Sequence, residues 1–600
     1  MVFLVKKISK RRTNKINKLA REKSLYLRQH AGNPVAWWPW SEEVLKEGLR
    51  RDVPLFISIG YSACHWCHVM NRESFEDEEI AGLLNENFLP VKIDREEHPE
   101  IDAVYLLACE LATGRAGWPL TVLALPDGWP FFVATYLPKE GGGTRLGLKE
   151  LLKLVKKLWR EDRRRLLEAA QNFKKALAQI AFRREATVEP ALLLERAFEG
   201  AQRQFDPQFG GFGKGPKFPL ATRLLFLLRY GKRLANAKAL EIVRFTLLKM
   251  RFSALFDQVG FGFHRYTVDR AWKVPHFEKM LYDQGLLLYL YAEAAALLNE
   301  PIFEKTAEEI VTYLKERLRS PSGSFFCAES AESAEKEGLF YTWSLKEIEE
   351  NLSRQEAEIL IKYFSLKPEG NYLEEATGQP AGRNVLHPVD FPWLWAQKEN
   401  FNGFEKLLSS ILLKLKNIRA KRPYPPRDEK ILTDWNGLVI AGLAHAGRLL
   451  NRPDFVSLAE EAFAYLEQKA LWQGRLLHLP ETNLKGLLED YVYFTWAARE
   501  LWEATEAEKY LKFFYTLLDE TEKLFSSGEH LYHQVGKDQM PFLIPFYPVF
   551  EGALPSPNGL LALLFKQAGK DAASRKIISA VGGHLIEDPF SFPSFMMVFV

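Results

Sequence analysis

Cysteine is scarce in this sequence, which has four among 600 residues: Cys64, Cys67, Cys109 and Cys327. Proteins held together by a disulfide scaffold are far richer in cysteine, so that class is excluded. The apolar run at residues 1–5 is too short for the core of a signal peptide, and we expect a reducing, cytoplasmic location. There, a close cysteine pair is more often catalytic or metal-binding than structural.

Long apolar runs and an excess of one charge are also lacking. No window offers the roughly 18 uninterrupted apolar residues of a membrane span. The formal net charge is +3, too balanced to indicate a membrane or nucleic-acid surface. One exception is the N-terminus, with nine Lys or Arg against one Glu by position 23. We expect residues 1–18 to form a solvated basic tail, with nucleic-acid contact as the less favoured alternative.

The chain is long enough for more than one domain, because 600 residues exceed what one hydrophobic core usually organises. Residues 54–60 and 88–94 are short runs rich in β-branched residues, and 118–132 read as two strands around the turn "PDG". Residues 146–182 are amphipathic and predict helices that close this unit. We therefore predict an α/β domain over residues 19–185.

Residues 186–600 have a different rhythm, with helix following helix. Helices that are apolar nearly all round alternate with amphipathic ones, about six times in all. The first kind must be buried and the second can cover it, which predicts an inner ring inside an outer ring, an (α/α)6 barrel. An α-solenoid is the alternative, but no regular period is present. The predicted inner helices lie at 285–298, 437–450, 490–504 and 559–569.

Polar and aromatic clusters precede these inner helices and would converge at one barrel end. Sugar epimerisation needs an acid and a base, for which His264 and His276 are candidates. Glycoside hydrolysis needs two carboxylates. Each residue also has a structural interpretation, because a carboxylate can cap a helix and a histidine can sit satisfied in the core. The barrel candidates are His264, Trp272, His276, Glu278, Asp283, Asp428, Trp435, Asn436 and Asp490.

The segment "PLFISIGYSACHWC" predicts a strand, a short loop and Cys-x-x-Cys at a helix start. Unpaired N–H groups there favour a thiolate, and His65 beside it would add to this effect. Cys64 would be the attacking thiol and Cys67 the resolving one. Alternatively, the pair is a non-reactive structural remnant.

A metal site is the third interpretation of the cysteine motif. Cys64, Cys67 and His68 would be ligands, with His65 or His98 as the fourth. Closed zinc sites usually draw on two separated ligand pairs, and no second Cys-x-x-Cys or His-x-x-x-His occurs in the chain. We therefore expect neither a metal nor a cofactor.

Several motifs carry a resemblance that runs from about residue 19 to near the end of the chain. The chain resembles the spermatogenesis-associated thioredoxin-like proteins, which implies a thioredoxin-like domain followed by a six-hairpin barrel similar to those of N-acylglucosamine epimerases and six-hairpin glycosidases. It also implies a protein thiol or disulfide partner and a carbohydrate ligand. The motifs are "SLYLRQHAGNPVAWWPW", "SIGYSACHWCHVMNRESFED", "VKIDREEHPEID", "GGFGKGPKF", "VPHFEKMLYDQ", "KILTDWNGL" and "EDYVYF".

Within this resemblance, Pro119 takes the place of the cis-proline that packs against the dithiol of thioredoxin-like folds. Thioredoxins also carry a buried acid six residues before the first cysteine, where this chain has Ser58. Proton transfer from Cys67 would then need another group, His65 or His68.

The chain also departs from the family pattern in the barrel. Ser330–Ser333 replace an Asp-Ala-Asp-Ser stretch, and Asp434 stands where a small residue is usual, whereas Asp428 and Glu429 match an acidic pair.

Three functions are compatible with these features. The favoured one is a thiol–disulfide oxidoreductase. The second is a carbohydrate epimerase, isomerase or hydrolase acting in the barrel, with the first domain as a lid or docking module. The third is a binding scaffold without turnover.

Overall fold

The computed structural model describes residues 17–143, 146–180, 182–374, 378–480 and 482–600. It divides into two units: the first holds the described residues up to Ile180 together with Phe542–Ile544, and the second holds the rest. Most of the expected basic tail, residues 1–16, lies outside the described residues. Lys18, in contrast, opens a 3-10 helix (Lys18–Arg21), and its Nζ lies 2.7 Å from the ring centroid of Trp38.

The first unit is built on a five-stranded sheet in the order β1-β3-β2-β4-β5. Strands β1, β3 and β2 are parallel, while β4 runs antiparallel to β2, and β5 antiparallel to β4. This order and these directions are those of a thioredoxin-like sheet. The strands are β1 Trp38–Pro39, β2 Leu55–Gly60, β3 Leu89–Asp94, β4 Leu120–Ala124 and β5 Pro130–Ala134.

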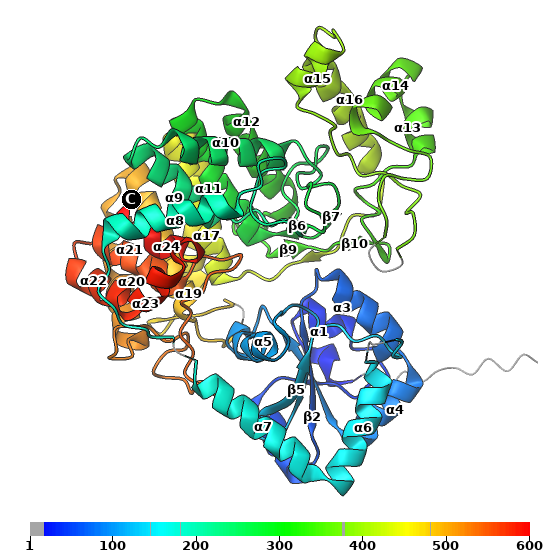
Figure 1. The fold of residues 1–600 in the computed structure, drawn as a ribbon, viewed down its shortest axis with the longest axis vertical. Helices are drawn as coiled ribbons and strands as arrows, with labels where there is room; N and C mark the ends of the chain where they lie inside the picture. The colour runs from blue at the N-terminus through cyan, green and yellow to red at the C-terminus, as the bar shows by residue number, and fades with distance from the viewer. Residues whose placement is uncertain (1–16, 144–145, 181, 375–377, 481) are drawn as a thin grey trace, which may run out of the picture. The chain divides into compact units, whose positions relative to one another are not determined.

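Helices cover both faces of this sheet, which is why β2 and β3 are buried along their whole length and read as continuous apolar runs. Helices α2 and α4 pack on β3. Helices α5 and α7 pack on β5, and Figure 1 labels these three elements. The helices are α1 Leu25–Gln29, α2 Glu42–Arg51, α3 His65–Met70, α4 Glu78–Asn87, α5 Pro99–Thr113, α6 Leu148–Glu161 and α7 Arg163–Ala178.

The second unit is the expected (α/α)6 barrel. Six inner helices each pack on the next, and the last returns to the first, which closes the ring. Six outer helices pack around them (Figure 1). The inner helices are α9 Ala221–Arg233, α11 Leu281–Leu298, α17 Thr433–Leu449, α19 Leu488–Thr505, α21 Pro557–Gln567 and α24 Pro593–Met596. The outer helices are α8 Pro190–Gln204, α10 Ala237–Arg251, α12 Pro301–Tyr313, α18 Pro453–Lys469, α20 Glu508–Phe525 and α22 Asp571–Ala580.

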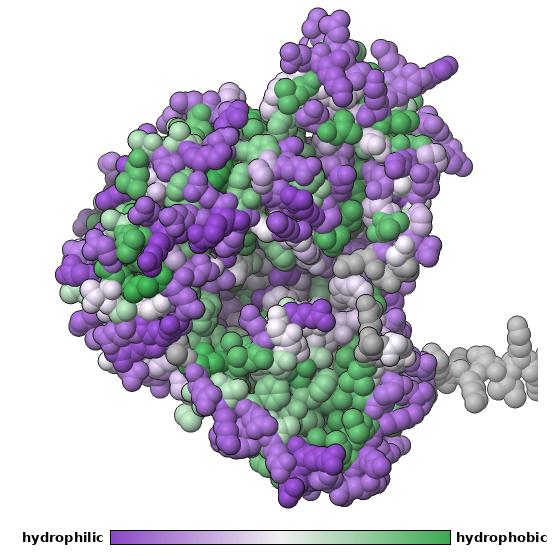
Figure 2. Space-filling model, in the orientation of Figure 1, coloured by the Kyte–Doolittle hydropathy of each residue, from purple (hydrophilic) through white to green (hydrophobic). Residues whose placement is uncertain are grey.

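Glycines set the close spacing of the inner ring. A Cβ on Gly285 of α11 would lie 2.9 Å from the amide nitrogen of Val439 in α17. A Cβ on Gly437 of α17 would lie 2.8 Å from the carbonyl carbon of Tyr493 in α19. Any side chain at these places would push backbones apart in a close-packed core. The outer helices show a largely hydrophilic surface, as their amphipathic pattern predicts (Figure 2).

An insertion between α12 and α17 is the main feature that the sequence did not reveal. It contains α13 Leu345–Asn351, α14 Arg354–Phe364, α15 Pro392–Lys398 and α16 Phe404–Arg419. These helices gather around buried aromatic residues of their own, among them Trp395, whose ring centroid lies 4.3 Å from that of Phe404. Helix α16 has the same amphipathic character as an outer barrel helix, so periodicity alone could not separate the two.

Within the described parts of the chain, no helix combines the length and the apolar character needed to cross a membrane.

Candidate functional site

The two cysteines of the motif lie where β2 gives way to α3. Cys64 is the residue that precedes the first turn of α3, with φ −73° and ψ 113°, and Cys67 lies one turn further on. Both are 2% exposed, and neither is in a disulfide. The first unit therefore places two cysteines one helical turn apart at the end of its central strand.

Gly60, the last residue of β2, shows what surrounds the second thiol. A Cβ on this residue would lie 2.5 Å from Cys67 Sγ and 2.5 Å from Tyr26 Oη. The sulfur and the phenol oxygen therefore both lie close to the Cα of Gly60. Burial raises the pKa of Tyr26 well above 10, and negative charge on Cys67 and Cys64 adds to the effect. Tyr26 is therefore a neutral donor facing the dithiol.

Lys92 lies directly behind the dithiol on β3. It pairs in register with Ser58 on β2, and its Nζ donates a hydrogen bond of 3.1 Å to Ser58 Oγ. The side chain is 1% exposed, and its Nζ lies 4.4 Å from the ring centroid of Phe75 and 5.0 Å from that of Tyr26. Burial lowers the pKa of Lys92 to about 7, while negative charge on the two cysteines opposes this shift.

Sequence reasoning found the gap at Ser58 but missed Lys92. The available signal was a charged residue in the middle of "LPVKID", a strand that is otherwise apolar apart from its last residue. A lysine there must either pair with an acid or lose its charge easily.

The other predicted members of this site have the following surroundings. His65 is 6% exposed, with its ring centroid 5.9 Å from that of Trp66. His68 Nε2 lies 2.8 Å from the carbonyl oxygen of Ser62. The bond that precedes Pro119 is cis. Among the residues described, neither thiol belongs to a group of three clustered metal-ligand side chains.

In the barrel, two of the family motifs contain a repeated ion-pair arrangement. Lys217 of "GGFGKGPKF" donates to Asp206 Oδ2 at 3.1 Å and to the carbonyl of Gly210 at 2.7 Å. Lys279 of "VPHFEKMLYDQ" donates in the same way to Asp257 Oδ2 at 2.9 Å and to the carbonyl of Phe261, four residues after Asp257, at 2.7 Å. Both lysines hold an Asp-x-x-x-Gly or Asp-x-x-x-Phe turn closed, so these motifs have a structural role.

The predicted histidines of the barrel also make structural contacts. His264 Nδ1 lies 2.9 Å from the carbonyl oxygen of Phe277, and burial, with the charge of Lys279, lowers the pKa of His264 to about 3. His276 Nδ1 lies 2.8 Å from Glu337 Oε1. The Trp272 indole donates to the carbonyl of Phe209 at 2.9 Å. His264 is neutral at physiological pH and is enclosed in the core.

Asn436 belongs to a second repeated arrangement. In it, a side-chain amide on the first turn of an inner helix forms hydrogen bonds with both the N–H and the C=O of one residue in a segment before that helix. Asn436 accepts from the amide of Phe325 at 2.8 Å and donates to the same residue's carbonyl at 2.9 Å. Gln284 on α11 and Asn558 on α21 bracket Phe263 and Tyr532 in the same way. Trp435 packs edge-on against Tyr282, with ring centroids 4.7 Å apart.

Glu278 and Asp283 lie close to Arg265. The guanidinium of Arg265 donates to Glu278 Oε1 at 3.0 Å. Burial raises the pKa of Asp283 well above its usual value, with the charge of Arg265 opposing the shift and that of Glu278 adding to it. Burial therefore favours the protonated form of Asp283, at the start of α11.

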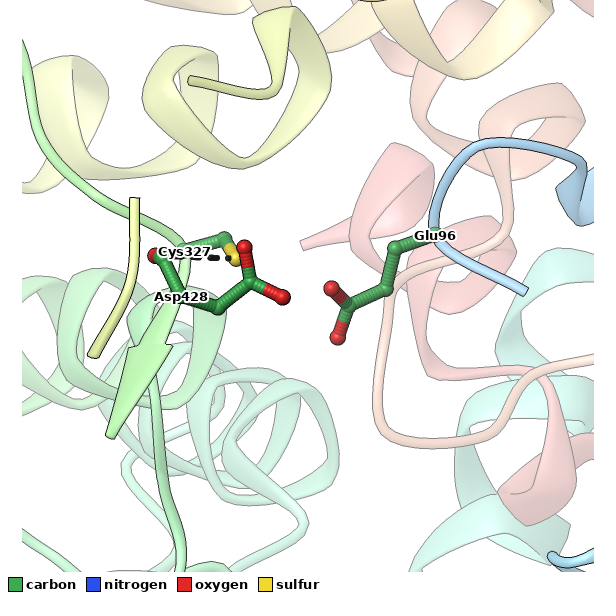
Figure 3. Close-up of side chains that lie close together, drawn as sticks. All are labelled: Glu96, Cys327 and Asp428. Carbon is green, nitrogen blue, oxygen red and sulfur yellow. Dashed lines mark hydrogen bonds between the residues drawn. The ribbon is translucent and has the colours of Figure 1, made fainter. Parts of the chain in front are cut away.

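Asp428 lies on the short strand β12 (Arg427–Asp428) of the barrel and is 2% exposed. Lys430 Nζ donates to Asp428 Oδ2 at 2.6 Å, which neutralises the carboxylate. The thiol of Cys327 lies 3.4 Å from the carbonyl oxygen of Asp428, and Figure 3 shows the two side chains next to each other.

Asp490 lies at the centre of an acidic cluster of the barrel, at the first turns of α17 and α19. Its carboxylate accepts from the backbone amides of Asp434, at 3.0 Å, and Leu487, at 2.7 Å, and His478 Nδ1 lies 3.0 Å from each oxygen. Burial and Asp490 raise the pKa of Asp434 to about 7, and burial raises that of Glu489 to about 8. The sequence analysis did not include His478 or Glu489.

Two cavities of the barrel lie away from these predicted residues, whereas a third, of about 330 Å³, has Trp272 in its lining. One, of about 530 Å³, is lined by the last turns of α9, α11, α17 and α19, opposite to their first turns. Another, of about 840 Å³, is lined by residues of α10, α12 and α16. None of the predicted barrel residues lines either of these two cavities.

The residues of the five-stranded sheet lie within a match to a known protein family. A family model described as thioredoxin-like DsbH, protein of unknown function, DUF255, matches residues 16–178. Spermatogenesis-associated protein 20 of Homo sapiens is 35% identical over 549 residues, which are 85% of this chain and 70% of that protein. An uncharacterized protein of Caenorhabditis elegans, B0495.5, is 30% identical over 530 residues, 83% of this chain and 72% of that protein.

Among solved structures, a cellobiose 2-epimerase from Bacillus thermoamylovorans has a TM-score of 0.43 at 9% identity, over 68% of this chain and 99% of that one. On the sequence comparisons, the chain belongs to the spermatogenesis-associated protein 20 family.

Proposed function

We propose that this protein is a thiol–disulfide oxidoreductase that acts through Cys64 and Cys67 on a disulfide of a partner protein. The observation that carries the proposal is the pair of cysteines at the β2–α3 junction, one of them close to a phenol, with a buried lysine that interacts electrostatically with both. A purely structural cysteine pair has no need of a neighbouring titratable amine, because an inert buried thiol behaves as a small apolar group.

The reaction is a two-step exchange. The Cys64 thiolate attacks one sulfur of the substrate disulfide; a Cys64–substrate disulfide forms, and the other substrate sulfur leaves as a thiolate. Cys67 then attacks Cys64 Sγ, so that the Cys64–Cys67 bond forms and the second substrate thiolate leaves. The substrate gains two electrons from the dithiol, and an external dithiol reductant must restore the reduced pair.

The test is a redox titration in buffers of reduced and oxidised dithiothreitol, followed by denaturation, maleimide labelling and mass spectrometry. We expect one disulfide between Cys64 and Cys67, which Cys64→Ser abolishes. Cys109→Ser is the matched control, because this thiol is also buried and burial raises its pKa. The control should titrate like the wild type. A pair that stays reduced at every potential, or a disulfide that persists in Cys64→Ser, contradicts the proposal.

A second candidate function, carbohydrate epimerisation or hydrolysis in the barrel, is favoured by the cluster around Asp490. Asp434 and Glu489 are carboxyls with raised pKa values beside a carboxylate that accepts backbone hydrogen bonds. Such a pairing of an acid with a carboxylate is what glycoside chemistry requires.

This candidate is tested by thermal stabilisation against a panel of mono- and disaccharides. The expected result is a sugar-dependent rise in melting temperature that Glu489→Gln removes and Glu503→Gln, on the same helix, leaves unchanged. A panel without any shift contradicts the candidate. If the dithiol is also inert in the redox titration, the remaining function is a binding scaffold.

A further inference from the structure

We infer that Lys92 is the proton acceptor of the dithiol: its neutral amine takes the proton from Cys67 when that thiol must attack. The inference rests on the proposed exchange reaction. Because Ser58 stands where thioredoxins have a buried acid, the proton of Cys67 needs another acceptor, and the inference assigns that role to Lys92. It concerns one proton at two atoms, Cys67 Sγ and Lys92 Nζ.

The position of Lys92 follows from the sheet. Strands β2 and β3 are parallel neighbours, and Ser58 and Lys92 are direct partners in their register. The lysine therefore projects from the strand beside the one that ends in Gly60, the residue over which Cys67 lies. A group on β3 thus occupies the space behind the dithiol that a carboxylate on β2 would otherwise fill.

The surroundings of Lys92 leave its amine without a counter-ion. Among the residues that the structure describes, Ser58 Oγ is the hydrogen-bond partner recorded for Nζ, and no carboxylate forms an ion pair with it. Ring centroids of Phe75, Tyr26 and Trp37 lie 4.4 to 5.0 Å from Nζ. Burial without an ion pair favours the neutral amine, which is the form that can accept a proton.

The other titratable groups around this amine are poor competitors. On α1, burial raises the pKa of Tyr26 well above 10, so it donates rather than accepts. His30, just after α1, has its pKa lowered well below 6.5 by burial and by Lys92, and its Nδ1 already contacts Asn33. On β3, Asp94 accepts a hydrogen bond of 2.6 Å from Ser24 Oγ. The charges that act on the pKa of Lys92 are those of the two cysteines.

His68 fits this role less well. His68 Nε2 is engaged with the carbonyl oxygen of Ser62 at 2.8 Å, so that nitrogen is a donor. Lys92, in contrast, interacts electrostatically with both cysteines.

The proton step balances without any further reagent. The Lys92 amine and the Cys67 thiol become an ammonium and a thiolate. The thiolate attacks Cys64 Sγ in the mixed disulfide, the internal disulfide forms and the substrate sulfur leaves with the bonding electron pair. When an external dithiol reduces the pair again, the ammonium returns its proton to Cys67. Tyr26 stabilises the transient thiolate of Cys67 by donating a hydrogen bond to it.

The experiment separates the two thiol steps by stopped flow with an aromatic disulfide reagent that releases a coloured thiolate. Attack by Cys64 releases the first equivalent, and attack by Cys67 on the mixed disulfide releases the second. In the wild type we expect the rate of the second phase to rise with pH and level off near 7, where the pKa of Lys92 lies.

The test variant is Lys92→Met, an apolar side chain of similar length that suits the aromatic surroundings and cannot accept a proton. We expect its second phase to slow about 100-fold at pH 7, the scale of general acid–base catalysis, and to rise instead through the ordinary titration range of a thiol. Lys153→Met, an exposed lysine on α6, is the matched control and should change neither phase. Ser58→Asp, added to Lys92→Met, should restore much of the rate by supplying a carboxylate acceptor.

The outcomes are distinguishable. A second phase in Lys92→Met with the wild-type rate and pH profile overturns the inference while the proposed function stands. A wild type that shows no first phase, and forms no disulfide in the redox titration, removes the proposed function itself. If Lys92→Met does not fold, the wild-type profile decides: a rise only through the ordinary thiol range overturns the role of Lys92.

Discussion

Among the described residues, Lys92, Lys217 and Lys279 are each no more than 1% exposed, and they fall into two kinds. In the barrel, Lys217 and Lys279 each bind an aspartate and a backbone carbonyl. In the thioredoxin-like unit, Lys92 is equally buried but has a serine hydroxyl and aromatic rings around its amine. The barrel lysines are held by full ion pairs, whereas Lys92 is not.

This difference separates lysines that stabilise the fold through ion pairs from a lysine that can exchange its proton. A buried ion pair is fixed, because removing either partner leaves the other charge desolvated. A buried amine without an acid keeps its proton weakly and can exchange it near neutral pH, which is the range in which thiol exchange operates. We therefore expect changes at the barrel pairs to affect stability, and changes around Lys92 to affect proton transfer.

The largest expected effect is at Asp257, which pairs with both Lys279 and Arg419. Asp257→Ala leaves two buried cations without a counter-charge and should lower the free energy of unfolding by about 3–5 kcal/mol. Urea denaturation followed by circular dichroism measures it. Asp454→Ala removes an exposed pair with Arg452 and should cost less than about 1 kcal/mol. Equal losses in the two variants would refute the structural role of the barrel lysines.

The next effect concerns the space between Cys67 and Tyr26. Gly60→Ala places a Cβ 2.5 Å from both Cys67 Sγ and Tyr26 Oη and should destabilise the protein by about 1–3 kcal/mol through overpacking. It should also slow both thiol phases, because the sulfur must move. Gly82→Ala on α4, whose Cβ would meet nothing within 4 Å, should instead stabilise by up to about 1 kcal/mol. If Gly60→Ala changed neither the free energy of unfolding nor the rates of the two thiol phases, the dithiol would be loosely packed.

Sequence patterns predicted much of the dithiol region, because its determinants are local. The strands around residues 54–60 and 88–94, the turn at 125–128 and the position of Cys64 before a helix all follow from short-range residue types. The contact between Lys92 and the dithiol does not, because it depends on which strands are neighbours and on their register. A register is a long-range property that a single sequence does not specify.

In the barrel, the alternation of apolar and amphipathic helices predicted the two rings, but not what the polar residues do. Asn436 and His264 read as ligand-binding candidates because polar residues near helix starts are typical of sites. Their partners, Phe325 and Phe277, are distant or hidden in loops, so the backbone hydrogen bonds that occupy them were invisible. The insertion α13–α16 was missed for a similar reason, since an amphipathic pattern does not say which core it faces.

A smaller effect appears in the pH dependence of stability around Lys92. Its pKa is about 7 in the folded protein and near 10.5 when unfolded, so between these values the unfolded chain binds more protons. Stability should therefore rise with pH across this window, by about 1 kcal/mol per unit from this group. Lys92→Met should remove that rise and be more stable than the wild type at pH 7. Denaturation at pH 7, 8 and 9 measures it, and a slope that persists in the variant would show that the lysine is not buried as described.

The smallest effect has the opposite sign and lies in the barrel. The folded pKa of Glu489 is about 8, above its value of about 4.5 in the unfolded chain, so between pH 4.5 and 8 the folded protein binds the extra proton. Stability should fall as pH rises through this window, by less than about 1 kcal/mol per unit, because Asp434 titrates alongside and shares the proton. Glu489→Gln should flatten this fall and raise stability at pH 7, with Glu503→Gln, an exposed residue of the same helix, as the control. Denaturation from pH 5 to 8 measures the two slopes. We expect Glu489→Gln and Lys92→Met to change the slope of stability against pH in opposite directions. A change in the same direction would contradict the two assigned states, in which the folded protein keeps the Glu489 carboxyl protonated and the Lys92 amine neutral.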